Sequence, residues 1–343
     1  MKFQKINKIE NVLDFEPKNG SYSFTKDNLN FLCVNNNFIQ KEECALELSL
    51  RGEYMYVWYA SLERVEIYSN ENTLISTIEG DVFLLNKETL YIGYSLLELN
   101  PFQSYRNLKN PFTNELILKE NIPYQLYVEK DIIIAYSIFK GEIKRINTDT
   151  ETLWQFTIAS LGDSPYPDEE DRIDKIVGIA NGNLWVYTKL YRLVALDIET
   201  GSVQYHTDCF GVQLDEVTEN IFAIASSGWT IIDTQTFTVK GNYFFSKEDP
   251  EGMGQYESVY KPLLQGDYFT FIGSKHKEYG GIGWIGIFDY KTRKLVWEYE
   301  LLPFEERKAT RNRLVAPQPL YMSGNKLYIK DIKDNLYIFE REE

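Results

Sequence analysis

The stretch that decides the fold is residues 175–206, KIVGIANGNLWVYTKLYRLVALDIETGSVQYH. Four short runs of aliphatic, aromatic and β-branched residues alternate here with turn residues, among them Asn181-Gly182 and Thr200-Gly201. Such runs, bounded by glycine and small polar residues, are typical of strands joined by tight turns. The stretch therefore predicts one four-stranded antiparallel sheet, whose strands we call A, B, C and D.

The same pattern recurs along the chain. Two polar or glycine residues precede a strongly apolar run at seven places, residues 52–53, 87–88, 130–131, 182–183, 219–220, 266–267 and 324–325. Glu53 and Asn325 lie 272 residues apart, so the mean period over six intervals is about 45 residues. Four strands in such a period are typical of a β-propeller blade. The sequence predicts an all-β fold, a seven-bladed propeller of four-stranded antiparallel blades.

The C strands also recur, and several end in a polar residue such as Asp197, Asp233 or Asp289. An aspartate at this position can accept hydrogen bonds from backbone N–H groups two residues further on, which closes a C–D hairpin. Four tryptophans lie on predicted strands, and we expect Trp154, Trp185, Trp229 and Trp297 to be buried between blades.

The chain ends shortly after the seventh C strand, so no seventh D strand follows it. We expect an N-terminal strand to close the ring, either residues 30–34 or the neighbouring residues 38–40. The residues before it, through Asp27, would be an extra outer strand or a strap. The predicted organisation is a single domain, residues 1–343, with an N-terminal extension and closing strand in 1–44 and repeat blades in 45–343.

Within these units the chain resembles the quinoprotein-type (PQQ-like) repeat superfamily. The best matches are residues 193–201 and residues 286–292 continuing to Trp297, and the resemblance covers most of the chain from about residue 50. It implies a propeller fold and not an activity. Quinoprotein enzymes of this type use a disulfide between adjacent cysteines and a bound calcium, whereas Cys33, Cys44 and Cys209 lie apart in this sequence.

Charge and composition restrict the partners. The chain carries 36 Lys+Arg and 51 Asp+Glu, a net charge of −15, which argues against nucleic acid and anionic membranes. No apolar leader segment and no window approaching ~18 apolar residues is present. Three sparse cysteines suit a reducing compartment. These features predict a cytoplasmic protein that is a monomer by itself.

The sequence offers no recognisable catalytic chemistry. Its two histidines, His206 and His276, have no metal-ligand spacing, and no Cys-x-x-Cys or Gly-x-Ser-x-Gly motif occurs. We therefore predict no catalytic residues, no cofactor and no metal, and classify the chain as not an enzyme.

Long connections gather on one predicted face. They are the D–A loops 109–123, 161–174, 246–262 and 303–319 and the B–C loop 274–283. Two of them mix acids with tyrosines, a composition suited to a protein partner, in particular a basic one. The candidate partner-binding residues are Tyr166, Asp168, Glu169, Glu170, Asp171, Asp249, Glu251 and Tyr256. The alternative is that these loops are solvated segments that keep the protein soluble.

Two functions follow from these observations. The first is a non-catalytic cytoplasmic propeller that binds a protein partner through its long-loop face, for instance an inhibitor such as an immunity protein against a secreted toxin. The alternative is a small-ligand or glycan-active enzyme with its site in the axial funnel. That enzyme would need paired carboxylates converging on an axial pocket.

Overall fold

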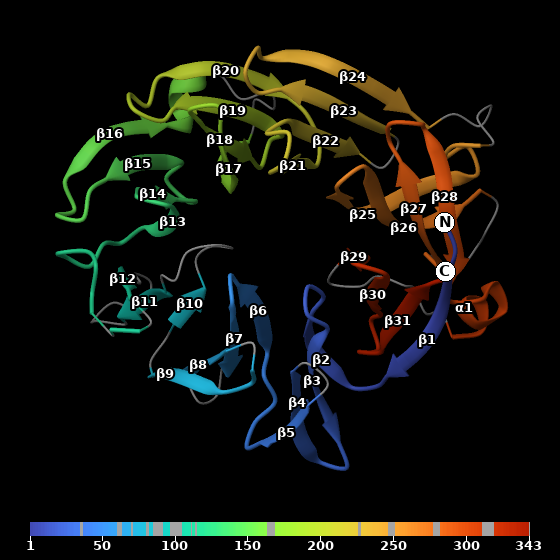
Figure 1. Cartoon of the computed structure of the whole chain (residues 1–343). Coiled ribbons are helices and arrows are strands. Elements are labelled where there is room, and N and C mark those ends of the chain that lie inside the picture. Colours follow the sequence, from blue (N-terminus) through green and yellow to red (C-terminus); the bar gives the residue numbers. More distant parts are fainter. Residues whose placement is uncertain are drawn as a thin grey trace. The chain divides into compact units, whose positions relative to one another are not determined.

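The structure is a computed structural model of the whole chain (Figure 1). It describes residues 1–34, 37–59, 64–69, 71–79, 82–84, 92–96, 105–110, 112–113, 115–162, 169–225, 228–245, 251–276, 282–310 and 319–342. The chain divides into two units, each described by itself below. We call residues 1–44 together with 210–343 the terminal unit, and residues 45–209 the central unit.

Among its described residues, the terminal unit contains four sheets, each of four antiparallel strands. Two of them follow chain order: β21 (Val212–Leu214), β22 (Ile221–Ala225), β23 (Gly228–Asp233), β24 (Thr238–Phe244), and β25 (Tyr256–Gln265), β26 (Tyr268–Lys275), β27 (Trp284–Asp289), β28 (Lys294–Glu300). A third comprises β29 (Tyr321–Ser323), β30 (Lys326–Lys330), β31 (Leu336–Arg341) and β1 (Phe3–Ile9). The fourth is β2 (Val12–Glu16), β3 (Ser21–Lys26), β4 (Leu29–Val34) and β5 (Asn37–Lys41).

The described part of the central unit also contains four sheets, all in chain order. The first is β6 (Glu47–Arg51), β7 (Tyr54–Tyr59), β8 (Arg64–Ser69) and β9 (Leu74–Glu79), and the second is β10 (Val82–Leu84), β11 (Ile92–Leu96) and β12 (Tyr105–Lys109). The third is β13 (Gln125–Glu129), β14 (Ile132–Ser137), β15 (Glu142–Ile146) and β16 (Thr152–Thr157). The fourth is β17 (Ile173–Ala180), β18 (Asn183–Thr188), β19 (Arg192–Asp197) and β20 (Val203–Asp208). Apart from strands, the described residues form the 3-10 helix η1 (Ile158–Leu161) and the helix α1 (Phe304–Thr310). No helix among the described residues is long and apolar enough to cross a lipid bilayer.

The all-β propeller class, the antiparallel four-stranded unit and closure by an N-terminal strand are confirmed. Among the described residues seven sheets have four strands, and β10–β12 forms an eighth sheet with three described strands. Each predicted repeat unit from residue 45 onward corresponds to one sheet. The additional sheet, β2–β5, comes from the segment that the sequence had assigned to an extension.

The predicted identity of the closing strand was wrong. Residues 30–34 and 38–40 lie in β4 and β5, and the residues through Asp27 form the rest of that sheet instead of a strap. The strand that closes the last sheet is β1, which pairs with β31 from Phe3↔Arg341 to Ile9↔Leu336. The error arose because residues 12–41 form a complete four-stranded sheet of their own, so the segment before Val12 is the one that pairs with β31. Asp27 and Asn28 both take positive φ, 52° and 61°, as a tight hairpin turn requires.

Most of the predicted core tryptophans are buried. Trp154, Trp185 and Trp229 are buried as expected, while Trp297 is only half-buried against the core. Trp154 also links neighbouring sheets, because its Nε1 donates to the carbonyl oxygen of Ile198 at 2.8 Å. Gly201, at φ 72°, makes this contact possible, since a Cβ there would lie 2.6 Å from the Trp154 ring.

The predicted role of aspartate in the C–D turns is confirmed. Oδ1 of Asp197, Asp233 and Asp289 accepts hydrogen bonds from the backbone N–H groups two and three residues further on. A hydrogen bond from Lys240, together with those from the turn, lowers the pKa of Asp233 to about 2. The turn aspartate is therefore charged at neutral pH and holds the hairpin through charge-assisted hydrogen bonds.

Candidate partner-binding surface

The best-defined candidate site lies in the central unit, at the end of sheet β17–β20 where the B–C turn and the incoming D–A loop meet. Residues 169–172 lead into β17, and residues 188–191 join β18 to β19. Backbone N–H of Lys189 donates to the carbonyl oxygen of Arg172 at 2.9 Å. Backbone N–H of Leu190 donates to Oδ1 of Asp171 at 3.0 Å. The two connections are therefore held together by hydrogen bonds.

Asp171 organises this end of the sheet. Its side chain is only 5% exposed, and its Oδ2 lies 3.6 Å from Nε of Arg192, whose side chain is also buried. Its Oδ1 also accepts from the backbone N–H of Arg172 at 2.9 Å. Oδ1 is therefore satisfied by two backbone donors, while the buried Oδ2 has the Arg192 guanidinium at ion-pair distance. The prediction that Asp171 contacts a partner directly is corrected here, because the side chain positions the loop from within.

Replacing Asp171 should test this role. We expect Asp171→Ala to lower the free energy of unfolding by about 2–4 kcal/mol, because it removes an acceptor and leaves the Arg192 cation buried beside it. Urea denaturation measures the change. The control is Glu170→Ala, since Glu170 is exposed and its change should stay within about 0.5 kcal/mol. Equal effects of the two substitutions would contradict the assignment.

Two aromatic side chains that the sequence analysis did not select project at this end. Tyr191 is 40% exposed and its backbone takes φ 68°, a left-handed conformation that is unusual for a bulky residue. Its backbone N–H donates to Thr188 O at 3.1 Å, and its carbonyl oxygen accepts from Cys209 N at 2.9 Å. These hydrogen bonds hold the ring-bearing residue in a strained conformation. The sequence did carry a signal for this exposed tyrosine. The turn between two clear strands consists of Lys, Leu and Tyr and contains no glycine or asparagine.

Phe139 is the second exposed aromatic residue, and it is 80% exposed in the turn between β14 and β15. Gly141 of the same turn lies beside the loop, because a Cβ on it would be 3.9 Å from the carbonyl oxygen of Asp171. Both aromatic turns therefore flank Asp171. We call Phe139, Glu169, Glu170 and Tyr191 the loop-end surface.

The charge of the loop-end surface is mixed. Glu169 and Glu170 are exposed, and Glu170 lies 3.5 Å from the guanidinium of Arg172. Lys140 and Lys189 are exposed in the two flanking turns. A surface ion pair such as Glu170–Arg172 contributes little stability. Among the described residues, this end of the unit therefore carries aromatic side chains together with both acidic and basic ones. It is less acidic than the sequence indicated.

The remaining predicted site residues are dispersed. Tyr166, Asp168 and Asp249 lie outside the described residues. Glu251 belongs to the terminal unit, where its exposed carboxylate is 3.0 Å from Nζ of Lys294.

Tyr256 is a core residue and not a surface anchor. It is 2% exposed, its ring packs edge-to-face with Phe271 at 5.0 Å, and its hydroxyl donates to Oε2 of Glu298 at 2.7 Å. Gly273 makes room for the ring, since a Cβ there would approach it to 2.8 Å. The prediction was wrong because β25 begins at Tyr256, inside the stretch 246–262 that the sequence had assigned to a loop.

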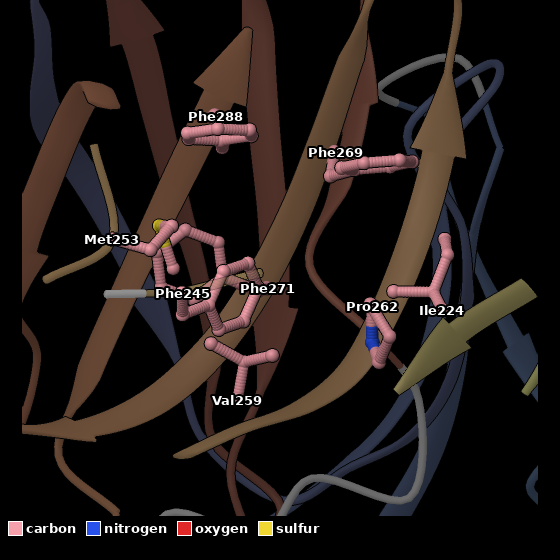
Figure 2. Close-up of a pocket in the computed structure, with 8 residues that line it drawn as sticks. All are labelled: Ile224, Phe245, Met253, Val259, Pro262, Phe269, Phe271 and Phe288. Atoms are coloured by element: carbon pink, nitrogen blue, oxygen red, sulfur yellow. The ribbon is translucent and has the colours of Figure 1, made fainter. Parts of the chain in front are cut away.

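Two observations bear on the alternative of an enzymatic site. No group of three or more His, Cys, Asp or Glu side chains there could hold a metal ion. A cavity in the terminal unit, shown in Figure 2, is lined only by apolar side chains, among them Ile224, Met253, Phe269 and Phe288. Its volume is about 10 Å³, too small for a substrate and too apolar to hold an ordered water.

Buried carboxylates elsewhere are engaged by neighbouring side chains. Glu66 lies 3.1 Å from Nη2 of Arg64 and accepts a hydrogen bond from the Tyr68 hydroxyl. Asp331 accepts from Asn335 Nδ2 at 2.9 Å and from the Tyr337 hydroxyl at 3.1 Å. Such satisfied groups stabilise the interior.

Comparison with known proteins identifies the fold. No protein-family model and no curated protein matches the sequence. One similar solved structure is BamB from Moraxella catarrhalis, which has 9% identity and a TM-score of 0.59; the match covers 99% of this chain and 100% of that one. The C-terminal WD40 domain of Sif2 has 8% identity and a TM-score of 0.61, covering 99% of both chains.

The dihydro-heme d1 dehydrogenase NirN is also similar, at 9% identity and a TM-score of 0.57, covering 93% of this chain and 69% of that one. Each of these three structures is less than a tenth identical to this chain. They establish the β-propeller fold, in agreement with the superfamily-level resemblance found in the sequence.

Proposed function

We propose that this chain is a non-catalytic β-propeller that binds a protein partner through the loop-end surface of its central unit. The observation that carries the proposal is the pair of exposed aromatic residues, Phe139 and Tyr191, on two turns that both lie beside the buried Asp171. Exposed tyrosine and phenylalanine side chains on ordered turns are the kind of residue that dominates binding energy when an interface forms.

The more specific form of the proposal is a cytoplasmic inhibitor of a basic protein, such as an immunity protein against a secreted toxin. Its support is the net charge of −15, which would accelerate encounter with a basic partner. Support for a reducing compartment comes from the three cysteines, all of which are free thiols.

Site-specific photo-crosslinking tests the surface. A benzophenone amino acid replaces Tyr191 in one variant and, in the control, Asp131, which is exposed in the turn at the other end of sheet β13–β16. After irradiation in cells, we expect a specific adduct from position 191 and none from position 131. Adducts from position 131 alone would overturn the proposed surface.

Once a partner is captured, its kinetics separate anchors from charges. We expect Tyr191→Ala or Phe139→Ala to accelerate dissociation about tenfold or more, with little effect on association. Charge reversal at Glu169 and Glu170 should mainly slow association, and added salt should reduce this effect. Surface plasmon resonance measures both rates, with the exposed Val203→Ala on β20 as the control. Dissociation rates unchanged by both aromatic substitutions would contradict the anchor role.

A further inference from the structure

A groove lies in the central unit at the end of sheet β6–β9 that carries the A–B and C–D turns. Its volume is about 410 Å³, within the range of sites for small ligands or single side chains. The residues that line it are Glu53, Tyr54, Ser69, Glu71, Thr73 and Ile75. None of these belongs to the loop-end surface.

One wall of the groove is aromatic and apolar. The Tyr54 ring is half-buried and lies 5.1 Å from the ring of Phe112, which is itself partly exposed. Ile75 adds an exposed aliphatic side chain. An aromatic ring next to solvent offers its face to flat or cationic groups.

The lining of the groove also carries two carboxylates, one on the A–B turn and one on the C–D turn. Ser69 fixes the C–D turn, because its Oγ accepts from the backbone N–H groups of Glu71 and Thr73 at 3.2 and 3.3 Å. Glu53 occupies the A–B turn directly before Tyr54. Both glutamates are exposed, and among the side chains that the structure describes neither has a cation within ion-pair distance.

Some turn acids in other sheets form ion pairs, whereas Asp131, Asp197 and Asp289 form none with the side chains that the structure describes. The ion pairs are Asp149–Lys119 at 3.9 Å, Glu199–Arg145 at 2.6 Å, Asp233–Lys240 at 2.6 Å and Asp267–Lys291 at 2.6 Å. The groove of sheet β6–β9 brings two acids that lack a described cation into one lining with the Tyr54 ring. This combination favours a cationic occupant from outside.

We infer that this groove binds an arginine side chain from a basic segment of another protein. A guanidinium can stack on the Tyr54 ring while its N–H groups donate to the Glu53 and Glu71 carboxylates. The hydroxyl of Thr73 lines the same space and can accept a further hydrogen bond. Arginine fits better than lysine because the guanidinium combines a flat stacking surface with several diverging donors.

The test uses the full chain and a fluorescein-labelled decapeptide of alternating arginine and glycine, followed by fluorescence anisotropy. We expect Glu53→Gln with Glu71→Gln to raise Kd about tenfold, since two charge-assisted contacts are lost. The matched control is Asp131→Asn with Asp149→Asn, which removes the same charge from the corresponding turns of sheet β13–β16. It should raise Kd by no more than about twofold. Thermal melts confirm that every variant is folded.

Changed peptides and a Tyr54 variant test whether the groove recognises arginine. A decapeptide with citrulline in place of arginine should lose binding, and Tyr54→Leu should weaken the arginine peptide several-fold. Equal weakening by the two double variants would overturn the inference, because binding would then follow net charge alone. No detectable binding to the unmodified chain would overturn it as well, and so would a lysine–glycine decapeptide that binds equally tightly.

Discussion

Removing residues 1–10 is expected to destabilise the terminal unit as a whole. Strand β1 supplies the fourth strand of the sheet β29–β31, and Phe3 lies buried in the core with Leu327, Ile329 and Phe339. The deletion would expose β31 as an edge and leave a cavity at the position of Phe3. Loss of a buried phenylalanine alone costs about 3–5 kcal/mol, and the lost strand pairing adds to this.

Urea denaturation of the full-length chain and of the truncated chain measures the effect. We expect the truncated chain to unfold at a clearly lower urea concentration, and a synthetic peptide of residues 1–10 to restore part of the difference in trans. Lys2→Ala in the full-length chain is the control, because Lys2 is exposed and contributes its backbone carbonyl to Glu342 N. A truncated chain with an unchanged midpoint would show that β1 does not close the sheet in solution.

The repeat could be predicted from the sequence because its turns carry their own chemistry. Aspartates such as Asp197 and Asp233 bond to the backbone of the turn in which they stand, and glycine at position 182 or 201 takes positive φ. These are local effects, readable without the rest of the fold. In the sheet β2–β5 the tight turn uses Asp27 and Asn28 in place of glycine, which made it harder to recognise.

The candidate surface was less predictable, because exposure depends on residues distant in sequence. Tyr256 is buried since Gly273 on the next strand leaves space for its ring, and Asp171 is buried since Leu190 and Arg192 supply its partners. No local pattern reveals such pairings. Tyr191 was missed for the same reason, because its exposure results from the way its turn packs against the incoming loop.

Trp185→Ala is expected to be among the most destabilising single substitutions in the central unit. The side chain is 0% exposed on β18, and its register partners on the adjacent strands are Gly178 and Ala195, both small. Its ring lies 6.2 Å from that of Tyr205 on β20, so the indole fills the space above two strands. Small neighbours cannot close the void left by alanine, and we expect a loss of about 3–5 kcal/mol.

Alanine substitutions at a half-buried tryptophan and at an exposed leucine give stability losses with which the loss from Trp185→Ala can be compared. Trp297 keeps part of its ring in solvent, so Trp297→Ala should cost less, and Leu153→Ala at an exposed position on β16 should change stability by no more than about 0.5 kcal/mol. Trp185→Phe should recover part of the loss, because it restores much of the apolar volume. Urea denaturation of the four variants orders them. If Trp185→Ala denatures at the same midpoint as the unsubstituted chain, the indole does not occupy the interior of the sheet stack, and the facing assigned to β18 is wrong.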